Sequence, residues 1–345
     1  MLKNRKFIAY ALVIVTTIAA TLSFYFWQVS TSANLNVKGE KTFVLYVPTG
    51  GSYKNVVDSL HKYKMIHDEI SFQFLSKWME YPENVKPGRY EIKPNAGNKE
   101  IISKLKGGRQ DDVRLTFNNI RLKSDLIKKI GSRFEFSDEE LLKKLKSKEV
   151  CAKYGFDTTT IMCMFLPNTY FVRWTTTPDK FLDRMHDEYK KYWTDEKLQK
   201  AKSINMTPVQ VAVMASIVQS ETNKKDEMPR VAGSYINRLA INMPLQADPT
   251  VKFAVGDFSI KRIMEKHLSI NSPYNTYRNT GLPPGPIALP EPVALDAVLN
   301  YERHKYIYFC AKEDFSGYHN FAESYSEHLN NARIYQEALN KAKIH

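Results

Sequence analysis

The sequence predicts an α+β protein with three parts: an N-terminal transmembrane helix, a small α+β module and a larger mixed α/β domain. Three observations lead to this prediction. Residues 7–27 carry no charge, residues 42–108 show the order strand, helix, helix, strand, and the remainder is a series of helices with few strands. With 345 residues and 43% hydrophobic content, the chain has enough apolar material for two or three folded units. An intrinsically disordered protein is therefore excluded.

Residues 7–28 are the predicted transmembrane helix. At a rise of about 1.5 Å per residue, "FIAYALVIVTTIAATLSFYFW" is long enough to cross a hydrocarbon core. Lys3, Arg5 and Lys6 precede it without any acidic residue, so the positive-inside rule predicts a cytoplasmic tail over 1–6. The predicted location is the inner (cytoplasmic) membrane, crossed once, with the rest of the chain periplasmic or extracellular.

A cleaved signal peptide is the competing interpretation of the same segment. Signal peptides share the basic start, but their apolar region spans about 7–15 residues before a small-residue cleavage site. Here the apolar stretch is longer and ends in the aromatic run "FYFW", which is typical of a membrane interface. A retained anchor is therefore the favoured prediction.

The net charge of +13 indicates an anionic neighbour, which could be lipid headgroups, an acidic wall polymer or nucleic acid. The predicted topology argues against nucleic acid. Between Arg121 and Glu149 basic and acidic residues alternate, a pattern typical of solvated helix faces. The three cysteines, Cys151, Cys163 and Cys310, allow at most one disulfide and match no zinc spacing.

After the anchor, residues 29–41 are predicted to be a short polar tether, and residues 42–109 a compact module. The module's expected elements are a strand over 42–47, a helix capped by Ser52, a helix through Phe72 and Trp78, a strand from Gly88 and a helix from Asn98. This order resembles a LysM-like module, a small fold associated with binding amino-sugar glycans. No ligand-contacting residue can be named within it.

Residues 110–345 form the predicted larger domain. Its expected elements are a strand over 113–117, helices over 124–130, 138–146, 178–193, 195–202, 208–221, 227–239 and 293–301, a strand over 306–311, and a closing helix through Tyr325 and Leu339. An aromatic loop from Met164, a turn holding Gln246 and Asp248, and a proline-rich loop over 273–292 connect them. In that last loop, aromatic rings alternate with hydrogen-bonding groups suited to a sugar ring, namely Tyr274, Asn275, Tyr277 and Arg278.

A glutamate ends the most apolar of these helices, which begins at the predicted N-cap Thr207. Counting back from Glu221 by three, four and seven reaches Val218, Ile217 and Met214. Helical spacing therefore places the Glu221 carboxyl on an apolar face. Either this carboxyl is buried at a cost in free energy, or it has a chemical function.

The ordered segments "ASIVQSET", "VAGSYINRL", "MPLQADPTV", "SPYNTYRNTGLPPGPIALP" and "YIYFCA" with "GYHNFA" resemble the YceG-like family of membrane-anchored endolytic murein transglycosylases. The resemblance covers nearly the whole chain. It implies cleavage inside peptidoglycan strands between N-acetylmuramic acid and N-acetylglucosamine, leaving a 1,6-anhydro end. It also implies work beside peptidoglycan synthases or transpeptidases.

The resemblance implies that Glu221 is the catalytic acid. Many relatives carry a glutamate at the position of Gln219; two residues from Glu221 on a helix, that side chain would point away from it. Motif position assigns substrate contact to five residues: Asn237, Gln246, Asp248, Asn275 and Tyr277. His319 lies in a family-like segment and is expected to have a packing or hydrogen-bonding role. We expect no metal and no cofactor, because the histidines show no metal-binding spacing and no phosphate-binding glycine loop is present.

A lytic transglycosylase needs a single carboxyl, because the C6 hydroxyl of the muramic acid is the nucleophile. Burial among apolar groups would raise the pKa of Glu221 and keep it protonated near neutral pH. Three alternatives stay open. Glu221 could be a structural glutamate paired with Arg230 or Arg238; the enzyme could be a lysozyme-like hydrolase that also uses Asp248; or the chain could be a non-catalytic glycan-binding scaffold. Asp248 itself is either a second carboxylate at the site or a turn residue before Pro249.

Overall fold

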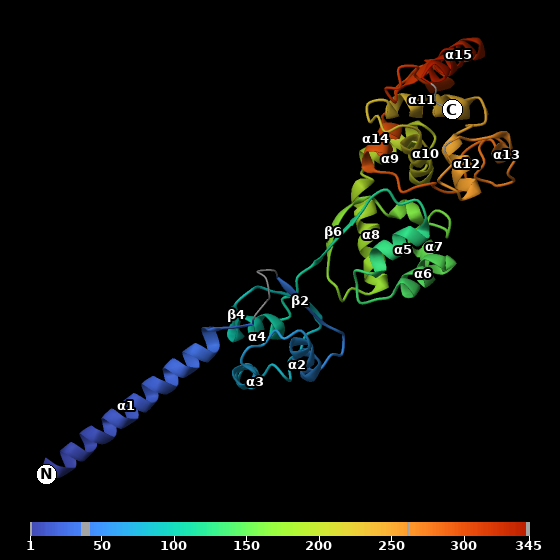
Figure 1. The fold of residues 1–345 in the computed structure, drawn as a ribbon. Coiled ribbons are helices and arrows are strands. Elements are labelled where there is room, and N and C mark those ends of the chain that lie inside the picture. Colours follow the sequence, from blue (N-terminus) through green and yellow to red (C-terminus); the bar gives the residue numbers. More distant parts are fainter. Residues whose placement is uncertain (1, 36–41, 261, 343–345) are drawn as a thin grey trace. The chain divides into compact units, whose positions relative to one another are not determined.

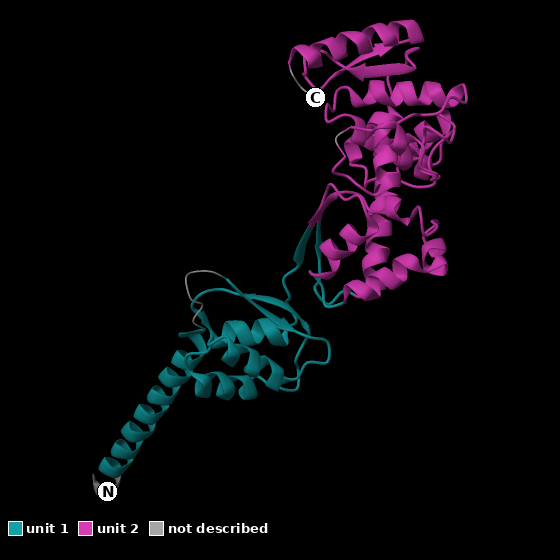
Figure 2. Ribbon diagram, turned by 45° about the vertical axis from the view of Figure 1, so that its right-hand side comes forward, with its two compact units in different colours: residues 1–115, 133–136, 170–176 teal, residues 116–132, 137–169, 177–345 magenta. Residues whose placement is uncertain are grey.

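The computed structural model describes residues 2–35, 42–260 and 262–342, and the chain divides into two compact units (Figure 2). Unit 1 comprises residues 1–115, 133–136 and 170–176; unit 2 comprises residues 116–132, 137–169 and 177–345. Helices and two-stranded antiparallel ladders make up both units, and the predicted α+β class is confirmed.

The elements of unit 1 are an N-terminal helix followed by two small ladders and three short helices (Figure 1). They are α1 (Leu2–Thr31), β1 (Ala33–Leu35), β2 (Phe43–Val47), α2 (Tyr53–Lys62), α3 (Glu69–Trp78), β3 (Gly88–Ile92), β4 (Ala96–Gly97) and α4 (Asn98–Lys106). Strands β2 and β3 pair antiparallel with Leu45 opposite Tyr90, both buried. As predicted, Ser52 caps α2, in a reciprocal arrangement with Asn55.

The predicted tether over 29–41 is wrong for its first half. Residues Ala33–Leu35 form β1, which pairs with β4, and Leu35 is 1% exposed in the core of the module. Val29, in the last turns of α1, belongs to the same core. The polar composition of the segment hid these two apolar side chains. Leu35 is buried through the pairing of β1 with β4, some sixty residues further on. Residues 36–41 lie outside the described part of the chain.

Helix α1 is long and apolar enough to cross a membrane over Arg5–Thr31, and no part of its apolar window is buried in the protein. A signal sequence would meet the same criteria of length and composition. Within the described residues it is the one helix that meets them.

Unit 2 holds the remaining helices and one further ladder. The elements are α5 (Lys123–Gly131), α6 (Asp138–Lys146), α7 (Lys148–Lys153), the 3-10 helix η2 (Ile161–Met164), α8 (Pro178–Tyr192), α9 (Asp195–Ser203), α10 (Pro208–Glu221), α11 (Met228–Ala240), α12 (Asp248–Val255), α13 (Glu265–Leu268), α14 (Pro292–Leu299), β7 (Tyr308–Ala311), β8 (His319–Ala322) and α15 (Tyr325–Lys341). A ladder of β5 (Val113–Phe117) and β6 (Asn168–Val172) has residues in both units.

Two of the connections predicted from the sequence are regular elements in the structure. The aromatic loop from Met164 contains β6, in which Tyr170 and Val172 alternate with more exposed residues. The turn expected around Asp248 is instead the first turn of α12, with Pro249 in its first positions, where a missing N–H costs nothing.

Helix α10 is the central element of unit 2. It packs against α9, α11, α12 and α14, and every residue from Val211 to Val218 is buried. Thr207 caps it as predicted, accepting a hydrogen bond from the backbone N–H of Gln210 (3.2 Å). A helix enclosed by four others is held rigidly, so its last residue, Glu221, has a well-defined position.

Candidate active site

Glu221 lies at the edge of a pocket of about 240 Å³ in unit 2. Met214, Ile217 and Val218 are fully buried on the same helix, so the apolar face predicted for Glu221 is confirmed. Glu221 itself stays partly accessible through the pocket. The pocket is lined by Glu221, Arg238, Leu245, Gln246, Asp248, Tyr277, Phe309, Cys310, Ala311 and His319.

The hydroxyl group of Tyr235 is the hydrogen-bond partner of the Glu221 carboxyl. It donates to Oε1 over 2.6 Å. Tyr235 lies on α11, is 1% exposed, and packs its ring edge-on against Phe309 of β7. The sequence offered only a weak signal for this role, because Tyr235 stands among apolar residues that serve the packing of α11 on α10.

Burial raises the pKa of Glu221 to about 7. The hydrogen bond from Tyr235 opposes this shift because it stabilises the ionised form, whereas the nearby negative charge of Asp248 raises the pKa further. The positive charges of Lys252 and Arg238 act in the lowering direction. A carboxyl with this pKa exchanges its proton near neutral pH, which suits a general acid.

Asp248 and Tyr277 form a second pair in the pocket. The Tyr277 hydroxyl donates to Asp248 Oδ1 over 2.6 Å. Burial and the neighbouring Asp248 charge raise the pKa of Tyr277, so its hydroxyl stays protonated. Asp248 is exposed to the pocket at the start of α12, where its carboxylate faces the same space as Glu221.

Arg238 is a buried cation, 7% exposed, that joins two walls of the pocket. Its guanidinium donates to the carbonyl oxygens of Leu245 (2.7 Å) and Ile307 (2.6 Å), and lies 3.5 Å from Gln246 Oε1. Gln246 adopts a left-handed backbone with φ of 49° and extends into the pocket lining.

The arginine partners suggested by the alternative interpretation of Glu221 are engaged elsewhere. Arg230 pairs with Glu302 at 3.0 Å on the surface, and Arg238 donates to main-chain carbonyls. Glu221 therefore differs from a structural glutamate neutralised by a salt bridge.

His319 also lines the pocket, next to a buried glutamate. Its Nδ1 lies 2.8 Å from Glu227 Oε2, and its backbone N–H donates to Glu227 Oε1 over 2.7 Å. Glu227 is 4% exposed. The expected hydrogen-bonding role of His319 is thus observed, at a place where the ring also meets the pocket.

Two of the five predicted substrate contacts, Asn237 and Asn275, lie outside the pocket lining. The Asn237 amide donates to the carbonyl oxygens of His304 (2.8 Å) and Tyr306 (3.0 Å). These bonds hold α11 against the segment that leads into β7. We therefore keep Gln246, Asp248 and Tyr277 as candidate contacts and assign Asn237 a positioning role.

Asn275, within the proline-rich loop, is fully buried. Its amide nitrogen donates to the carbonyl oxygens of Leu268 and Ile270, each over 2.9 Å, and its Oδ1 accepts from the backbone N–H of Tyr277 at 3.1 Å. The side chain thus positions Tyr277 for its contact with Asp248.

Asn275→Ala is expected to lower the free energy of unfolding by about 2–3 kcal/mol, because it leaves buried carbonyl and N–H groups without partners. Urea unfolding followed by tryptophan fluorescence measures this change. Asn279→Ala is the matched control, an exposed asparagine in the same loop that also donates to carbonyl oxygens. A loss for Asn275→Ala no greater than that of the control would contradict the positioning role.

Gln219 points away from Glu221, as expected from its spacing. Its Oε1 accepts from the backbone N–H of Glu291 at 2.6 Å, and its amide donates to the carbonyl of Leu289. The side chain therefore anchors the end of the proline-rich loop to α10.

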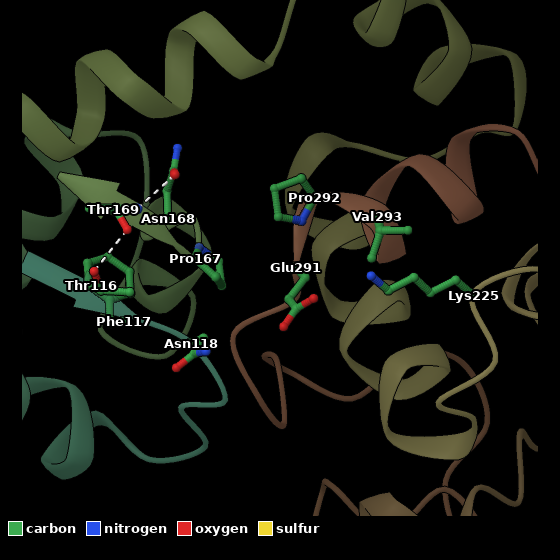
Figure 3. A pocket seen from close by; sticks show the side chains of 10 residues that line it. All are labelled: Thr116, Phe117, Asn118, Pro167, Asn168, Thr169, Lys225, Glu291, Pro292 and Val293. Carbon is green, nitrogen blue, oxygen red and sulfur yellow. Dashed lines mark hydrogen bonds between the residues drawn. The ribbon is translucent and has the colours of Figure 1, made fainter.

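A second pocket of about 350 Å³ lies beside Glu291 (Figure 3). Asn118 and Asn168 lie on one side of it, and Glu291 and Lys225 on the other. This second pocket offers hydrogen-bonding groups but excludes Glu221, so we place acid chemistry in the first.

Fold and site together define a mixed α+β protein whose central helix presents one protonatable carboxyl to a polar pocket. The chain belongs to the YceG-like family, whose sequence profile matches residues 45–334.

Relatives of known name are similar over most of this chain. It is 29% identical over 294 residues to the endolytic murein transglycosylase of Bacillus subtilis strain 168, covering 80% of this chain and 81% of that protein. It is 24% identical over 312 residues to the endolytic murein transglycosylase of Streptococcus pneumoniae strain D39, covering 80% of this chain. This chain spans 55% of the length of the pneumococcal protein.

A solved structure supports the fold. The crystal structure of a yceG-like protein from Listeria monocytogenes, at 2.6 Å resolution, matches with a TM-score of 0.57 and 24% sequence identity. The match covers 85% of this chain and 99% of the Listeria chain. At this level of identity the likeness concerns the fold alone.

Proposed function

We propose that this chain is an endolytic lytic transglycosylase, a lyase that cuts peptidoglycan strands at the bond between N-acetylmuramic acid and N-acetylglucosamine. The names of the Bacillus and pneumococcal relatives support the reaction class. The single observation that carries the proposal is the Glu221 carboxyl, whose pKa burial raises to about 7, at the edge of an accessible polar pocket.

In the proposed mechanism Glu221 first acts as a general acid. Its proton passes to the glycosidic oxygen as the bond from the anomeric carbon to that oxygen breaks. The C6 hydroxyl of the same muramic acid attacks the anomeric carbon, and its proton passes to the Glu221 carboxylate. The products are a 1,6-anhydro end and a new free hydroxyl, and no water is consumed.

The neighbours of Glu221 have supporting roles in this proposal. Tyr235 holds the carboxyl through its 2.6 Å hydrogen bond and stabilises the ionised form between the two proton transfers. The Asp248 carboxylate, held by Tyr277, faces the positive charge that develops on the sugar ring. Gln246 is a hydrogen-bonding contact for the strand.

Tyr235→Phe and Asp248→Asn are expected to move the pKa of Glu221 in opposite directions. Loss of the Tyr235 hydrogen bond raises it, and loss of the Asp248 charge lowers it. Because the free enzyme must carry the proton, the alkaline limb of the pH profile of kcat/KM should move up for the first variant and down for the second. If the alkaline limb stayed at the wild-type pH in both variants, the assignment of Glu221 as the acid would be contradicted.

A lysozyme-like hydrolase is the second candidate function, because Asp248 lines the same pocket as Glu221. The two carboxyl groups could then serve as acid and as nucleophile or base. Hydrolysis would leave reducing ends on the muramic acid, whereas transglycosylation leaves anhydro ends.

Mass spectrometry of the products distinguishes the candidates. The full chain in detergent is incubated with uncrosslinked peptidoglycan strands, beside Glu221→Gln. Anhydro-muramyl ends from the wild type alone are the expected result. Reducing ends would support hydrolysis with Asp248, and intact strands in both samples would favour a glycan-binding scaffold.

We further propose that α1 is a retained anchor in the cytoplasmic membrane, with residues 1–6 in the cytoplasm and both units outside. The packing of Phe26 on the core of the module supports retention, because cleavage after the apolar stretch would remove this contact. Peptidoglycan synthases or transpeptidases are the proposed partners. The LysM-like order of β2, α2, α3 and β3 makes glycan binding by the module part of the same proposal.

A further inference from the structure

Helix α3 carries apolar side chains on two opposite faces. Phe72 and Leu75 are buried in the core of the module. On the outer face Ile70, Phe74 and Trp78 are 80%, 51% and 63% exposed. These three residues are spaced four apart and so form one continuous outer stripe, where a helix of a soluble module usually carries polar groups.

The outer stripe continues directly into α1. The ring of Trp78 packs edge-on against Phe26 of α1, with the ring centroids 4.9 Å apart. Around this contact Phe24, Tyr25 and Trp27 of α1 are each more than half exposed. Bulky aromatic residues at the end of an apolar helix are typical of the membrane–water interface.

Buried polar groups hold α1 and α3 in a fixed arrangement. The Asn98 amide donates to the carbonyl of Val29 in α1 (3.1 Å) and to the hydroxyl of Ser71 in α3 (3.0 Å). The Asn34 amide donates to Asn98 Oδ1 over 2.8 Å. The outer stripe therefore has a defined position relative to the end of α1.

We propose that the outer stripe of α3 lies in the interface of the same bilayer that α1 crosses, with Ile70, Phe74 and Trp78 inserted at the boundary between headgroups and acyl chains. This inference rests on the proposed membrane anchor. The occupant is the lipid itself, because the stripe adjoins the lipid-exposed end of α1. Exposed Lys77, beside Trp78, supplies a positive charge for anionic headgroups.

A consequence is that the module contacts the membrane through two elements. An anchor alone would let α1 and the module fixed to it tilt together in the bilayer, whereas a second contact through α3 restricts that tilt. Burial of three large apolar side chains in the interface would supply the driving force.

Photocrosslinking tests the proposal in the full chain, reconstituted in nanodiscs of phosphatidylcholine and phosphatidylglycerol. The photoreactive residue p-benzoylphenylalanine replaces Phe74 in one variant. Leu22, an exposed residue of α1, is the position for the anchor control, and Tyr46, an exposed aromatic residue on β2, is the control within the module. After illumination, mass spectrometry measures the yield of lipid adduct at each position.

The expected result is lipid adduct at positions 22 and 74 and none at position 46. Adduct at position 22 alone would overturn the inference and leave the anchor intact. Absence of adduct at all three positions would overturn both the anchor and the inference. Capture of a second protein copy at position 74 in place of lipid would assign the stripe to self-association and would also overturn the inference. Cleavage of strands by each variant in detergent is assayed in parallel, so that failure of the membrane contact is distinguished from failure of the proposed activity.

Discussion

Glu221→Gln is expected to lower the rate of strand cleavage by a factor of about 10²–10⁴, the usual contribution of a general acid. The amide has nearly the shape of the carboxyl and can still accept the hydrogen bond of Tyr235, but it has no proton of suitable acidity to donate to the leaving oxygen. The rate at which new ends form, measured with purified strands, gives the factor. Glu291→Gln, which alters the carboxylate in the second pocket, is the matched control and should cleave at close to the wild-type rate.

The loss of activity should not come from a loss of folding. The pKa of Glu221 is about 7 in the folded protein against an ordinary value of 4.5, so the folded state holds the proton more tightly. Stability is therefore lost as the pH rises from 4.5 through 7, by about 3 kcal/mol in total. Glu221→Gln does not pay this cost and should unfold at higher urea concentration than the wild type at pH 8. A variant that is both inactive and less stable at pH 8 would point to a structural role, and full activity would exclude Glu221 as the acid.

Arg238→Met is expected to lower the free energy of unfolding by about 3–5 kcal/mol, because two hydrogen bonds from a buried charged donor are lost. The substitution keeps an unbranched side chain but removes the donors to the carbonyl oxygens of Leu245 and Ile307, which are left without their partner. Leu245 lines the pocket and Ile307 directly precedes β7, whose Phe309 lines it, so activity should fall as well. Urea unfolding at constant pH measures the change in stability.

Arg230→Met is the matched control for this prediction. It alters the same residue type on the same helix, but the ion pair of Arg230 with Glu302 is exposed and is expected to contribute less than about 1 kcal/mol. Similar losses for the two variants would show that Arg238 is not an essential structural cation.

Much of the local structure around the site could be predicted from residue patterns. Thr207 as a helix cap and the apolar face beneath Glu221 follow from neighbours on one helix, where spacing alone decides which side chains meet. The contact between Tyr235 and Glu221 could not be predicted in this way. It depends on how α11 lies against α10, and a tyrosine within an amphipathic helix has the same sequence signature whether it packs or donates a hydrogen bond.

The roles of amide side chains are equally hard to predict from the local sequence. Asn275 stands beside tyrosines in a polar loop, as a sugar-binding asparagine would, yet it binds three main-chain groups. Strand β1 was missed because its burial comes from pairing with β4, far away in the sequence. In each case the deciding partner lies outside the local window that composition and spacing describe.

The most direct test of the account is a titration of the Glu221 carboxyl itself. Infrared difference spectra between the wild type and Glu221→Gln, recorded across the pH range, isolate the band of this one protonated carboxyl. A midpoint near pH 7 is the predicted result, because burial raises the pKa of Glu221 to about 7. A midpoint near the ordinary value of 4.5 would mean that Glu221 is ionised at neutral pH, and would contradict its role as the acid.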